Sequence, residues 1–415
     1  MRFHPAQKKR SPLPLMDIYE ESVQLHKKLN GKLEVISKTE IKDKKDLSLI
    51  YTPGVAEVCK IIDQDHDKAY ELTIKGNTVA IVSDGSAVLG LGNIGPYAAI
   101  PVMEGKAVLF KEYAGINAFP ITVNTQNSFE VINLVKNIAP VFAGINLEDI
   151  SAPRCFEIEE ALQDIGIPVF HDDQHGTAIV LLAALINSAK LAGKDMRELR
   201  VVINGAGAAG TAIAQLLLCV GHNPDVCEPV KEIIVVDSKG IVTTKRADIM
   251  ENPWKMRLAT ITNRNQVEGG LDDAMTGADV FIGVSKGALL TPASIKKMND
   301  KPIIFAMANP TPEIMPDEAK EAGAFIVGTG RSDLPNQVNN VLAFPGVFLG
   351  AIQARAHTIT NEMKIEAAFA LAECVEKPTV DNILPSPLDK TVAPKIAKRV
   401  SEVYKKGQEL LKNAS

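Results

Sequence analysis

The chain has 415 residues, of which 46% are hydrophobic and 23% are charged, and its formal net charge is −5. One core rarely organises so many residues, so we expect two domains in a soluble globular protein. The weak acidity argues against nucleic acid or a membrane as a partner, and no apolar run reaches the ~20 residues of a bilayer span. Five scattered cysteines without a CxxC pair indicate reduced thiols in a cytoplasmic protein.

The first segment, residues 1–15, is basic, lacks acidic residues and contains Pro5, Pro12 and Pro14. The prolines oppose a helix, so we expect a disordered arm, with a targeting peptide as the alternative. An N-terminal domain is expected over 16–162 and starts with a helix at 17–30. Within it, the apolar run 78–83 precedes Asp84 and Gly85, which is the pattern of a buried strand that ends in a turn.

A glycine-rich stretch at 90–95 matches the spacing of a dinucleotide fingerprint. Pro96 follows its last glycine directly, and no strand that ends in an acidic residue follows at the right distance. We interpret the stretch as a backbone-rich loop that opens a helix at 97–113. The loop is either a plain structural turn or is aimed at a substrate carboxylate.

From Gly176 onward the sequence becomes more continuously apolar. Residues 176–192 are apolar on nearly every face and stop at Gly193, which predicts a buried helix with a glycine C-cap. Strand candidates then alternate with helical or loop segments, at 200–204, 232–236, 258–262, 279–284, 302–307 and 324–328. Such alternation indicates a parallel sheet. We expect an α/β fold with a Rossmann-type, doubly wound nucleotide-binding domain over 163–395 and a C-terminal helix at 396–415. The last ~70 residues are expected to be helical and to pack back on the N-terminal domain.

The clearest motif lies after the strand at 200–204 and consists of Gly205, Ala206, Gly207, Ala208, Ala209 and Gly210. The first glycine allows a tight turn, the second admits a pyrophosphate, and the third lets the following helix pack closely on the sheet. The strand at 232–236 ends in Asp237, followed by Ser238, where a carboxylate can accept from ribose hydroxyls. This order of elements predicts a bound nicotinamide dinucleotide.

Polar groups follow several other expected strands, as ligand sites on open parallel sheets require. Asn309 offers both a donor and an acceptor at one such end. Glu148 and Asp149 follow one apolar run, and Asp172 and Asp173 follow another. Carboxylates without a thiolate favour Mg²⁺ or Mn²⁺. His171 and His175 could serve a softer metal only on a helix, and residues 168–170 just before them are expected to be extended, so we assign both histidines supporting or packing roles.

Acid–base chemistry also needs a base and an acid. Lys106 is flanked by apolar residues, and burial together with a nearby cation can lower the pKa of a lysine. Tyr51 lies in a Tyr-Thr-Pro-Gly stretch. Pattern alone says little for either residue, since an isolated lysine or tyrosine is more often structural or exposed.

Taken together, these motifs resemble the malic enzymes, specifically the compact bacterial type, from about Met16 to the C-terminal helices. The resemblance implies that Lys106 is the general base and Tyr51 the general acid, with Asp172 beside them. It implies Mn²⁺ or Mg²⁺ on Glu148, Asp149 and Asp173. The remaining implied contacts with L-malate and the nicotinamide are made by Asn309, Asn339 and Asn340. The motifs that carry the resemblance are Tyr51–Val55, Asp84–Gly92, Glu148–Asp149, His171–Thr177, Ala308–Pro310 and Asn339–Asn340.

One position departs from the family pattern, because Ala87 stands where larger relatives carry an arginine for the substrate carboxylate. The backbone of 90–95 and the asparagines are the expected substitutes. The family activity is oxidative decarboxylation of L-malate to pyruvate and CO₂. The alternatives are a redox-neutral malolactic lyase and, in another class, an inactive nucleotide-binding regulator. Asp237 favours NAD over NADP, with Ser238, Lys239, Lys245 and Arg246 acting against it, and the resemblance implies a homodimer.

Overall fold

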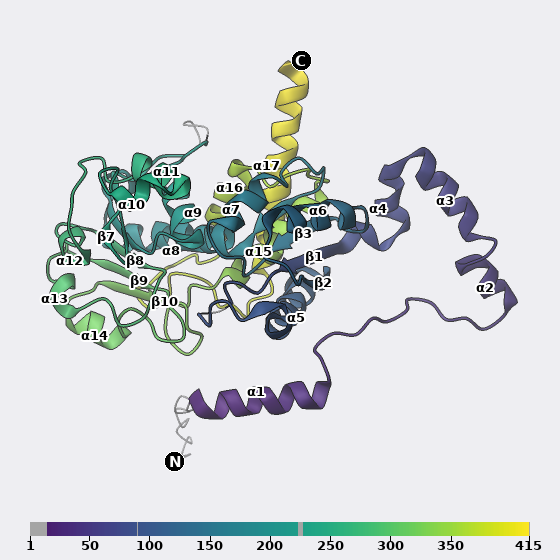
Figure 1. Cartoon of the computed structure of the whole chain (residues 1–415), viewed down its shortest axis with the longest axis horizontal. Coiled ribbons are helices and arrows are strands. Elements are labelled where there is room, and N and C mark those ends of the chain that lie inside the picture. The colour runs from purple at the N-terminus through teal and green to yellow at the C-terminus, as the bar shows by residue number, and fades with distance from the viewer. Residues whose placement is uncertain (1–14, 89, 223–226, 415) are drawn as a thin grey trace, which may run out of the picture.

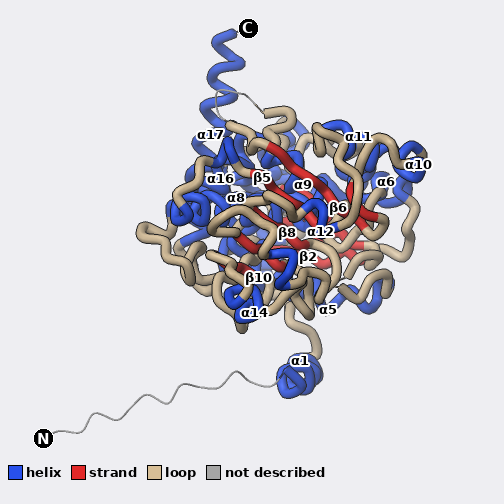
Figure 2. The backbone as a smooth tube through the Cα atoms, turned by 90° about the vertical axis from the view of Figure 1, so that its left-hand side faces the viewer, coloured by secondary structure: helices blue, strands red, loops and turns tan. Residues whose placement is uncertain are grey.

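The computed structural model describes residues 15–88, 90–222 and 227–414, and its architecture is drawn in Figures 1 and 2. The arm expected at 1–15 therefore lies, apart from Leu15, outside the described residues. Within them the chain forms two sheets flanked by helices, so the predicted α/β class is confirmed.

The first sheet contains four parallel strands in the order β2-β1-β3-β4. The residues of β1 alternate between two cores, since Val79 and Ile81 belong to one and Ala80 and Val82 to the other. Successive side chains of a strand point to opposite faces, so both faces of this sheet are covered. The strands are β1 Thr78–Ser83, β2 Asn117–Thr122, β3 Gly144–Leu147 and β4 Val169–His171.

The second sheet has the order β10-β9-β8-β5-β6-β7, and every neighbouring pair is parallel except β6 with β7. The order reverses between β5 and β8, which is where Rossmann-type sheets bind their ligands. The strands are β5 Arg200–Asn204, β6 Glu232–Asp237, β7 Gly240–Ile241, β8 Val280–Gly283, β9 Ile303–Ala306 and β10 Ile326–Thr329.

Helices cover both faces of the sheets and also form an N-terminal arm and a C-terminal projection (Figure 1). The α-helices are α1 Leu15–Leu29, α2 Lys44–Ile50, α3 Val55–Gln64, α4 Ala69–Leu72, α5 Gly95–Ala114, α6 Ser128–Ile138, α7 Arg154–Glu160, α8 Asp172–Ala192, α9 Ala208–Leu217, α10 Ala247–Met250, α11 Pro253–Ile261, α12 Leu271–Ala274, α13 Pro292–Ile295, α14 Pro316–Glu321, α15 Phe344–Gln353, α16 Asn361–Glu373 and α17 Val392–Ala414. Short 3₁₀ turns lie at His66–Lys68, Ile74–Asn77, Ala139–Val141, Met196–Glu198 and Asn340–Leu342.

One expected strand, 258–262, is wrong, because most of it belongs to α11. Asn252 caps this helix by accepting from the Lys255 N–H, and Pro253 occupies its first turn. These are start signals of a helix. A short apolar run cannot by itself distinguish a strand from a buried helix.

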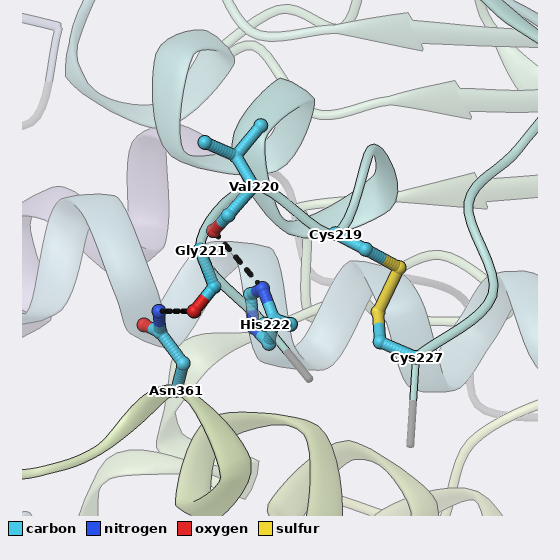
Figure 3. Close-up of a disulfide and its surroundings, with 6 residues drawn as sticks. All are labelled: Cys219, Val220, Gly221, His222, Cys227 and Asn361. Carbon is cyan, nitrogen blue, oxygen red and sulfur yellow. Dashed lines mark hydrogen bonds between the residues drawn. A yellow bond between two sulfur atoms is a disulfide. The ribbon is translucent and has the colours of Figure 1, made fainter. Parts of the chain in front are cut away.

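The interpretation of all five cysteines as reduced thiols is also wrong, because Cys219 and Cys227 form a disulfide (Figure 3). After α9 the chain turns back, and Val230 N–H donates to Leu217 O. This return brings the two Cα atoms within 5.8 Å, a separation that a disulfide spans. Cys59, Cys155 and Cys374 are free thiols.

Helix α8 links the two sheets and begins four residues earlier than expected. Among the described helices it alone has the length and apolar composition of a membrane span, and 72% of that stretch is buried within the protein. This is the environment of a core helix, in agreement with the predicted buried helix. Gly193 ends it in the left-handed conformation, as a C-cap glycine does.

The C-terminal helices pack back on the first sheet, as the sequence predicts. Phe110 of α5 contacts Phe344 and Phe348 of α15, with ring centroids 4.8 and 5.3 Å apart. Phe348 also meets Phe170 of β4 edge to face. Edge-to-face pairs add to the stabilisation from burial alone.

The N-terminal arm, residues 18–77, contrasts with this packing, since it contains no buried residue. Lys32 still contacts α5 through Glu104 and Pro101 O. Beyond Lys32, α2 and α3 lie away from the rest of the protein, and α4 leads back to β1 (Figure 1). Large apolar side chains such as Val35 and Ile36, exposed by 84% and 73%, lie along this excursion.

Phe348 should contribute strongly to stability because its buried ring packs against Phe110 of α5 and Phe170 of β4. Phe348→Ala is expected to lower the free energy of unfolding by about 3–5 kcal/mol, measured by urea denaturation. The matched control is Phe129→Ala, because Phe129 is 71% exposed. Equal effects of the two substitutions would contradict the assignment of a core at this position.

Candidate active site

The two acidic pairs lie next to each other at one edge of the first sheet. Glu148 and Asp149 follow β3, and Asp172 and Asp173 open α8 directly after β4. The carboxyl ends of β3 and β4 meet because the strands are parallel neighbours. Asp149 N–H donates to Asp173 Oδ2 at 2.9 Å, which ties one pair to the other.

Three of these residues form a cluster that suits a divalent cation. Glu148, Asp149 and Asp173 each offer one carboxylate oxygen, and these atoms lie within 4.8 Å of one another. All the donors are oxygens, the ligands that Mg²⁺ and Mn²⁺ prefer. Burial raises the pKa of Glu148 and of Asp173, and a bound cation would favour their ionised forms. The donor set therefore fits a hard divalent metal.

Lys106, on α5, reaches into this group of carboxylates. Its Nζ lies 2.5 Å from Asp172 Oδ2 and 2.8 Å from Glu148 Oε1. Nζ also stands 4.2 Å from the centre of the Phe344 ring. Burial by itself would lower the pKa of Lys106, but the carboxylates of Asp172 and Glu148 outweigh burial and raise that pKa. A cation beside the same carboxylates would act in the opposite direction.

Asp172 is fully buried and is held from two sides. Asn340 Nδ2 donates to Oδ2 at 2.5 Å, the same oxygen that Lys106 binds. Burial raises the pKa of Asp172 to about 8. The other oxygen, Oδ1, has no hydrogen-bond partner among the described residues. Because an unpartnered buried acceptor is costly, we expect a ligand or water to bind it.

A cavity of about 650 Å³ opens over this group. It contains Asp149 and Asp173 from the cluster and the helix start at 207–209 from the fingerprint. It also contains residues that follow strands of the second sheet, namely Ser285, Gly330 and the predicted contact Asn309. Further lining residues are Ala87, Gly90, Asn339 and Asn340.

A second cavity of about 650 Å³ adjoins the first and shares Ala152, Gly207, Val284 and Ser285 with it. Gly205, Ala206, Asp237, Ser238 and Lys255 line its other walls. At Gly210 an added Cβ would lie 1.8 Å from Gly205 O, so this glycine permits the close approach of α9 to the loop. The two cavities together form a continuous path from the fingerprint to the acidic cluster.

At the far end of this path, Asp237 is surrounded by cations. Arg246 donates to both of its oxygens at 2.8 and 3.1 Å, and Lys255 Nζ lies 2.6 Å from Oδ2. Burial opposes ionisation of Asp237, but these hydrogen bonds outweigh it and lower the pKa of the carboxyl. Lys245 instead pairs with Glu268 on the surface.

Tyr51 is the predicted site residue that the structure does not bring to the cluster. It caps the end of α2 in the arm, is 68% exposed and does not line either cavity. Lys106, Asp172, Asn309, Asn339 and Asn340 do gather with the three metal-binding candidates. Asn340 additionally binds Asp172, so its amide holds a carboxylate as well as facing the cavity.

The extended segment expected before the histidines is confirmed, because Val169–His171 form β4, whereas His175 lies in the first turn of α8. Neither belongs to the oxygen cluster. His175 Nε2 lies 2.9 Å from Glu159 Oε1, so it supports α8 from the side of α7.

Three supporting residues escaped sequence analysis because each comes from a distant segment. Lys255 and Glu159 bind Asp237 and His175, as above. Arg154 binds Ser86 Oγ at 2.8 Å and Ser151 Oγ at 3.1 Å, which fixes the cavity wall that contains Ala87. No local motif marks any of them.

Gly176 should be required for the placement of Asp172. A Cβ at this position would lie 1.8 Å from Asp172 Oδ1. Gly176→Ala is therefore expected to reduce kcat at this site by at least about tenfold, because small displacements of positioned groups are costly. Gly407→Ala is the control, since a Cβ at Gly407 meets nothing within 4 Å. Full activity of the Gly176 variant would contradict this role.

Comparison with known proteins identifies the family of the chain. Family models described as the malic enzyme N-terminal domain and the malic enzyme NAD-binding domain match residues 30–132 and 174–405. The bifunctional malic/malolactic enzyme of Bacillus subtilis is 55% identical over 93% of each chain. The NAD-dependent malic enzyme of Geobacillus stearothermophilus is 50% identical over 97% of this chain and 82% of its own.

A solved structure gives the same result. The crystal structure of the NAD-dependent malic enzyme of Thermotoga maritima is 49% identical and superposes with a TM-score of 0.87, covering 92% of this chain and 98% of that one. Sequence and fold thus agree, and the chain belongs to the malic enzyme family.

Proposed function

We propose that the chain catalyses the oxidative decarboxylation of L-malate to pyruvate and CO₂, with reduction of NAD(P)⁺ and dependence on Mn²⁺ or Mg²⁺. The observation that carries this proposal is the position of Lys106, between Asp172 and Glu148 and beside the three-carboxylate cluster. The adjoining cavity leads directly to the glycine fingerprint. The names of the relatives support the same reaction.

The chain's own residues supply proton transfer and orientation. When bound, a divalent cation acts as a Lewis acid on the substrate oxygens and the nicotinamide accepts a hydride from C2. Lys106 Nζ takes the proton of the C2 hydroxyl, and Asp172 with Glu148 holds the resulting ammonium. After loss of CO₂, Tyr51 donates a proton to C3 of the enolate, which gives pyruvate. Glu148, Asp149 and Asp173 would hold the metal.

Recognition of the malate carboxylates must work without an arginine at position 87. Gly90, Asn309 and Asn339 line the same cavity as Ala87. Backbone N–H groups and side-chain amides are neutral donors that bind a carboxylate without an added charge. We assign carboxylate binding to these residues.

NAD is the proposed preferred cofactor, because a carboxylate at Asp237 opposes a 2′-phosphate. Arg246 and Lys255 neutralise much of that opposition, so discrimination against NADP should be modest. Curated relatives include both NAD- and NADP-dependent malic enzymes, which supports use of either cofactor within this family.

From the position of Tyr51 we infer a homodimer, in which the N-terminal arm of each subunit completes the site of the other. Within one chain Tyr51 lies outside both cavities, in an arm without any buried residue. Leu49 and Ile50 beside it are also exposed, by 63% and 41%. Contiguous exposed apolar surface of this kind marks a protein interface. A second copy of the chain both covers this surface and supplies a Lys106 for Tyr51 to work with.

A redox-neutral malolactic activity is the second candidate, because the Bacillus subtilis relative carries that activity in its name. Such a reaction needs the reduced cofactor to stay bound and return its hydride to pyruvate. The same Lys106 and acidic cluster would serve both reactions, so product analysis has to separate them.

The purified protein should reduce NAD⁺, and NADP⁺ less efficiently, in the presence of L-malate and Mn²⁺, with pyruvate and CO₂ as products. Removal of the metal with EDTA should abolish reduction, and added Mn²⁺ should restore it. Lactate without net reduced cofactor would favour the lyase instead. Turnover unaffected by EDTA would contradict the metal assignment.

Two single substitutions test the proposed base and acid. Lys106→Ala should lower kcat by about 10²–10⁴-fold, because it removes the general base. Tyr51→Phe should impair protonation of the enolate more selectively.

Mixing the two variants tests whether the site is shared between subunits. If Tyr51 acts across the interface, random assortment of the two variants restores about a quarter of wild-type activity, since half the dimers are mixed and carry one intact site. No gain above either parent would show that the two residues act within one chain.

Lys255 should govern tolerance of NADP. Lys255→Met is expected to lower kcat/KM for NADP⁺ about tenfold more than for NAD⁺, because it removes a cation beside Asp237. Lys245→Met is the matched control, since Lys245 pairs with Glu268 on the surface. An equal loss with both cofactors would place Lys255 away from the 2′-phosphate.

A further inference from the structure

A buried glutamate on α7 stands behind the acidic cluster without belonging to it. Glu159 is 9% exposed and lies ten residues after Asp149 and twelve before His171 in the sequence. It is separate from the three clustered carboxylates and does not line the cavity above them. Neither proton transfer nor cofactor binding as proposed above makes use of it.

Three donors from the start of α8 converge on this carboxylate. His171 N–H donates to Oε1 at 3.2 Å, Gln174 Nε2 donates to Oε2 at 3.1 Å, and His175 Nε2 lies 2.9 Å from Oε1. The residues between these donors are Asp172 and Asp173. Glu159 therefore binds His171 before the second acidic pair, and Gln174 and His175 after it.

Lys364 lies close enough to His175 and Glu159 to offset the negative charge of Glu159. Lys364 Nζ, on α16, lies 3.4 Å from His175 Nε2. Burial opposes ionisation of Glu159, but His175 and Lys364 outweigh burial and lower its pKa to about 2. Charge-assisted hydrogen bonds are stronger and more directional than neutral ones, so this carboxylate is a firm anchor.

The chain path shows what the anchor controls. From Asp149 the chain enters α7, reaches Glu159, then passes through β4 to Asp173. The two ends of this segment are joined at the cluster by the Asp149–Asp173 hydrogen bond. Between them, the bonds of Glu159 to His171, Gln174 and His175 join α7 to the start of α8. These bonds therefore add a second connection between the two acidic pairs, besides the pairing of β3 with β4.

We propose that Glu159 is a positioning residue that fixes the second acidic pair against the first, and so sets the affinity of Glu148, Asp149 and Asp173 for a divalent cation. This inference rests on the metal site of the proposed function. Partners that orient metal ligands typically contribute about 10–100-fold in metal affinity.

The test is Mn²⁺ binding to the metal-free protein, followed by the electron paramagnetic resonance signal of free Mn²⁺, without substrate or cofactor. Glu159→Gln keeps the shape of the side chain but places an amide donor against Gln174 or His175. It should weaken Mn²⁺ binding by about 10–100-fold. Glu160→Gln, an exposed neighbour on the same helix, should bind as the wild type does.

Gln174→Met provides an independent test if the Glu159 variant does not fold, because it removes one donor and leaves the carboxylate. It should weaken Mn²⁺ binding several-fold, and the apparent KM for Mn²⁺ should rise while the KM for NAD⁺ stays unchanged. Wild-type affinity in a folded Glu159→Gln or Gln174→Met protein would overturn the positioning role alone. Absence of Mn²⁺ binding in the wild type would instead overturn the metal site and, with it, this inference.

Discussion

Four carboxylates and one ammonium share a largely buried space at the carboxyl ends of β3 and β4. Gathering so much charge away from water is unfavourable unless the groups are paired and hydrogen-bonded. Lys106 offsets Asp172 and Glu148, Asn340 and Asn146 supply further hydrogen bonds, and the remaining negative charge is what a divalent cation would neutralise. The charge imbalance of this cluster is thus the physical basis of the metal binding that we propose.

The surrounding fold holds these groups in place despite their repulsion. Parallel pairing of β3 with β4 fixes both acidic pairs at one sheet edge. Helix α5 places Lys106 against Glu148 and Asp172 of these pairs. The α15 aromatic residues close the space behind Lys106, through Phe344 and its contact with Phe110. The catalytic cluster therefore depends on packing between the N-terminal domain and the C-terminal helices.

Features encoded by adjacent residues could be predicted from the sequence. The glycine loop before α9, Asp237 at the end of its strand, and the acidic pairs after apolar runs all carry local patterns, and each lies on a wall of the joined cavities or beside them. The family roles of Lys106 and Tyr51 came from resemblance, because neither residue has an informative local pattern.

Features that depend on distant segments could not be predicted. Glu159 and Lys255 become visible only when α7 meets α8 and α11 meets β6. The disulfide depends on the turn after α9, which brings together cysteines eight positions apart. The exposure of Tyr51 likewise depends on the path of the N-terminal arm, which no local pattern around Tyr51 marks. The strand wrongly expected at 258–262 illustrates the ambiguity of a short apolar run.

The most direct measurement of the central claim is the location of Mn²⁺ in crystals of the protein, determined from anomalous scattering. The account predicts one strong peak bounded by oxygens of Glu148, Asp149 and Asp173, beside Lys106. A protein crystallised in the presence of Mn²⁺ with no peak at this cluster, or with its peak at another set of residues, would contradict the account.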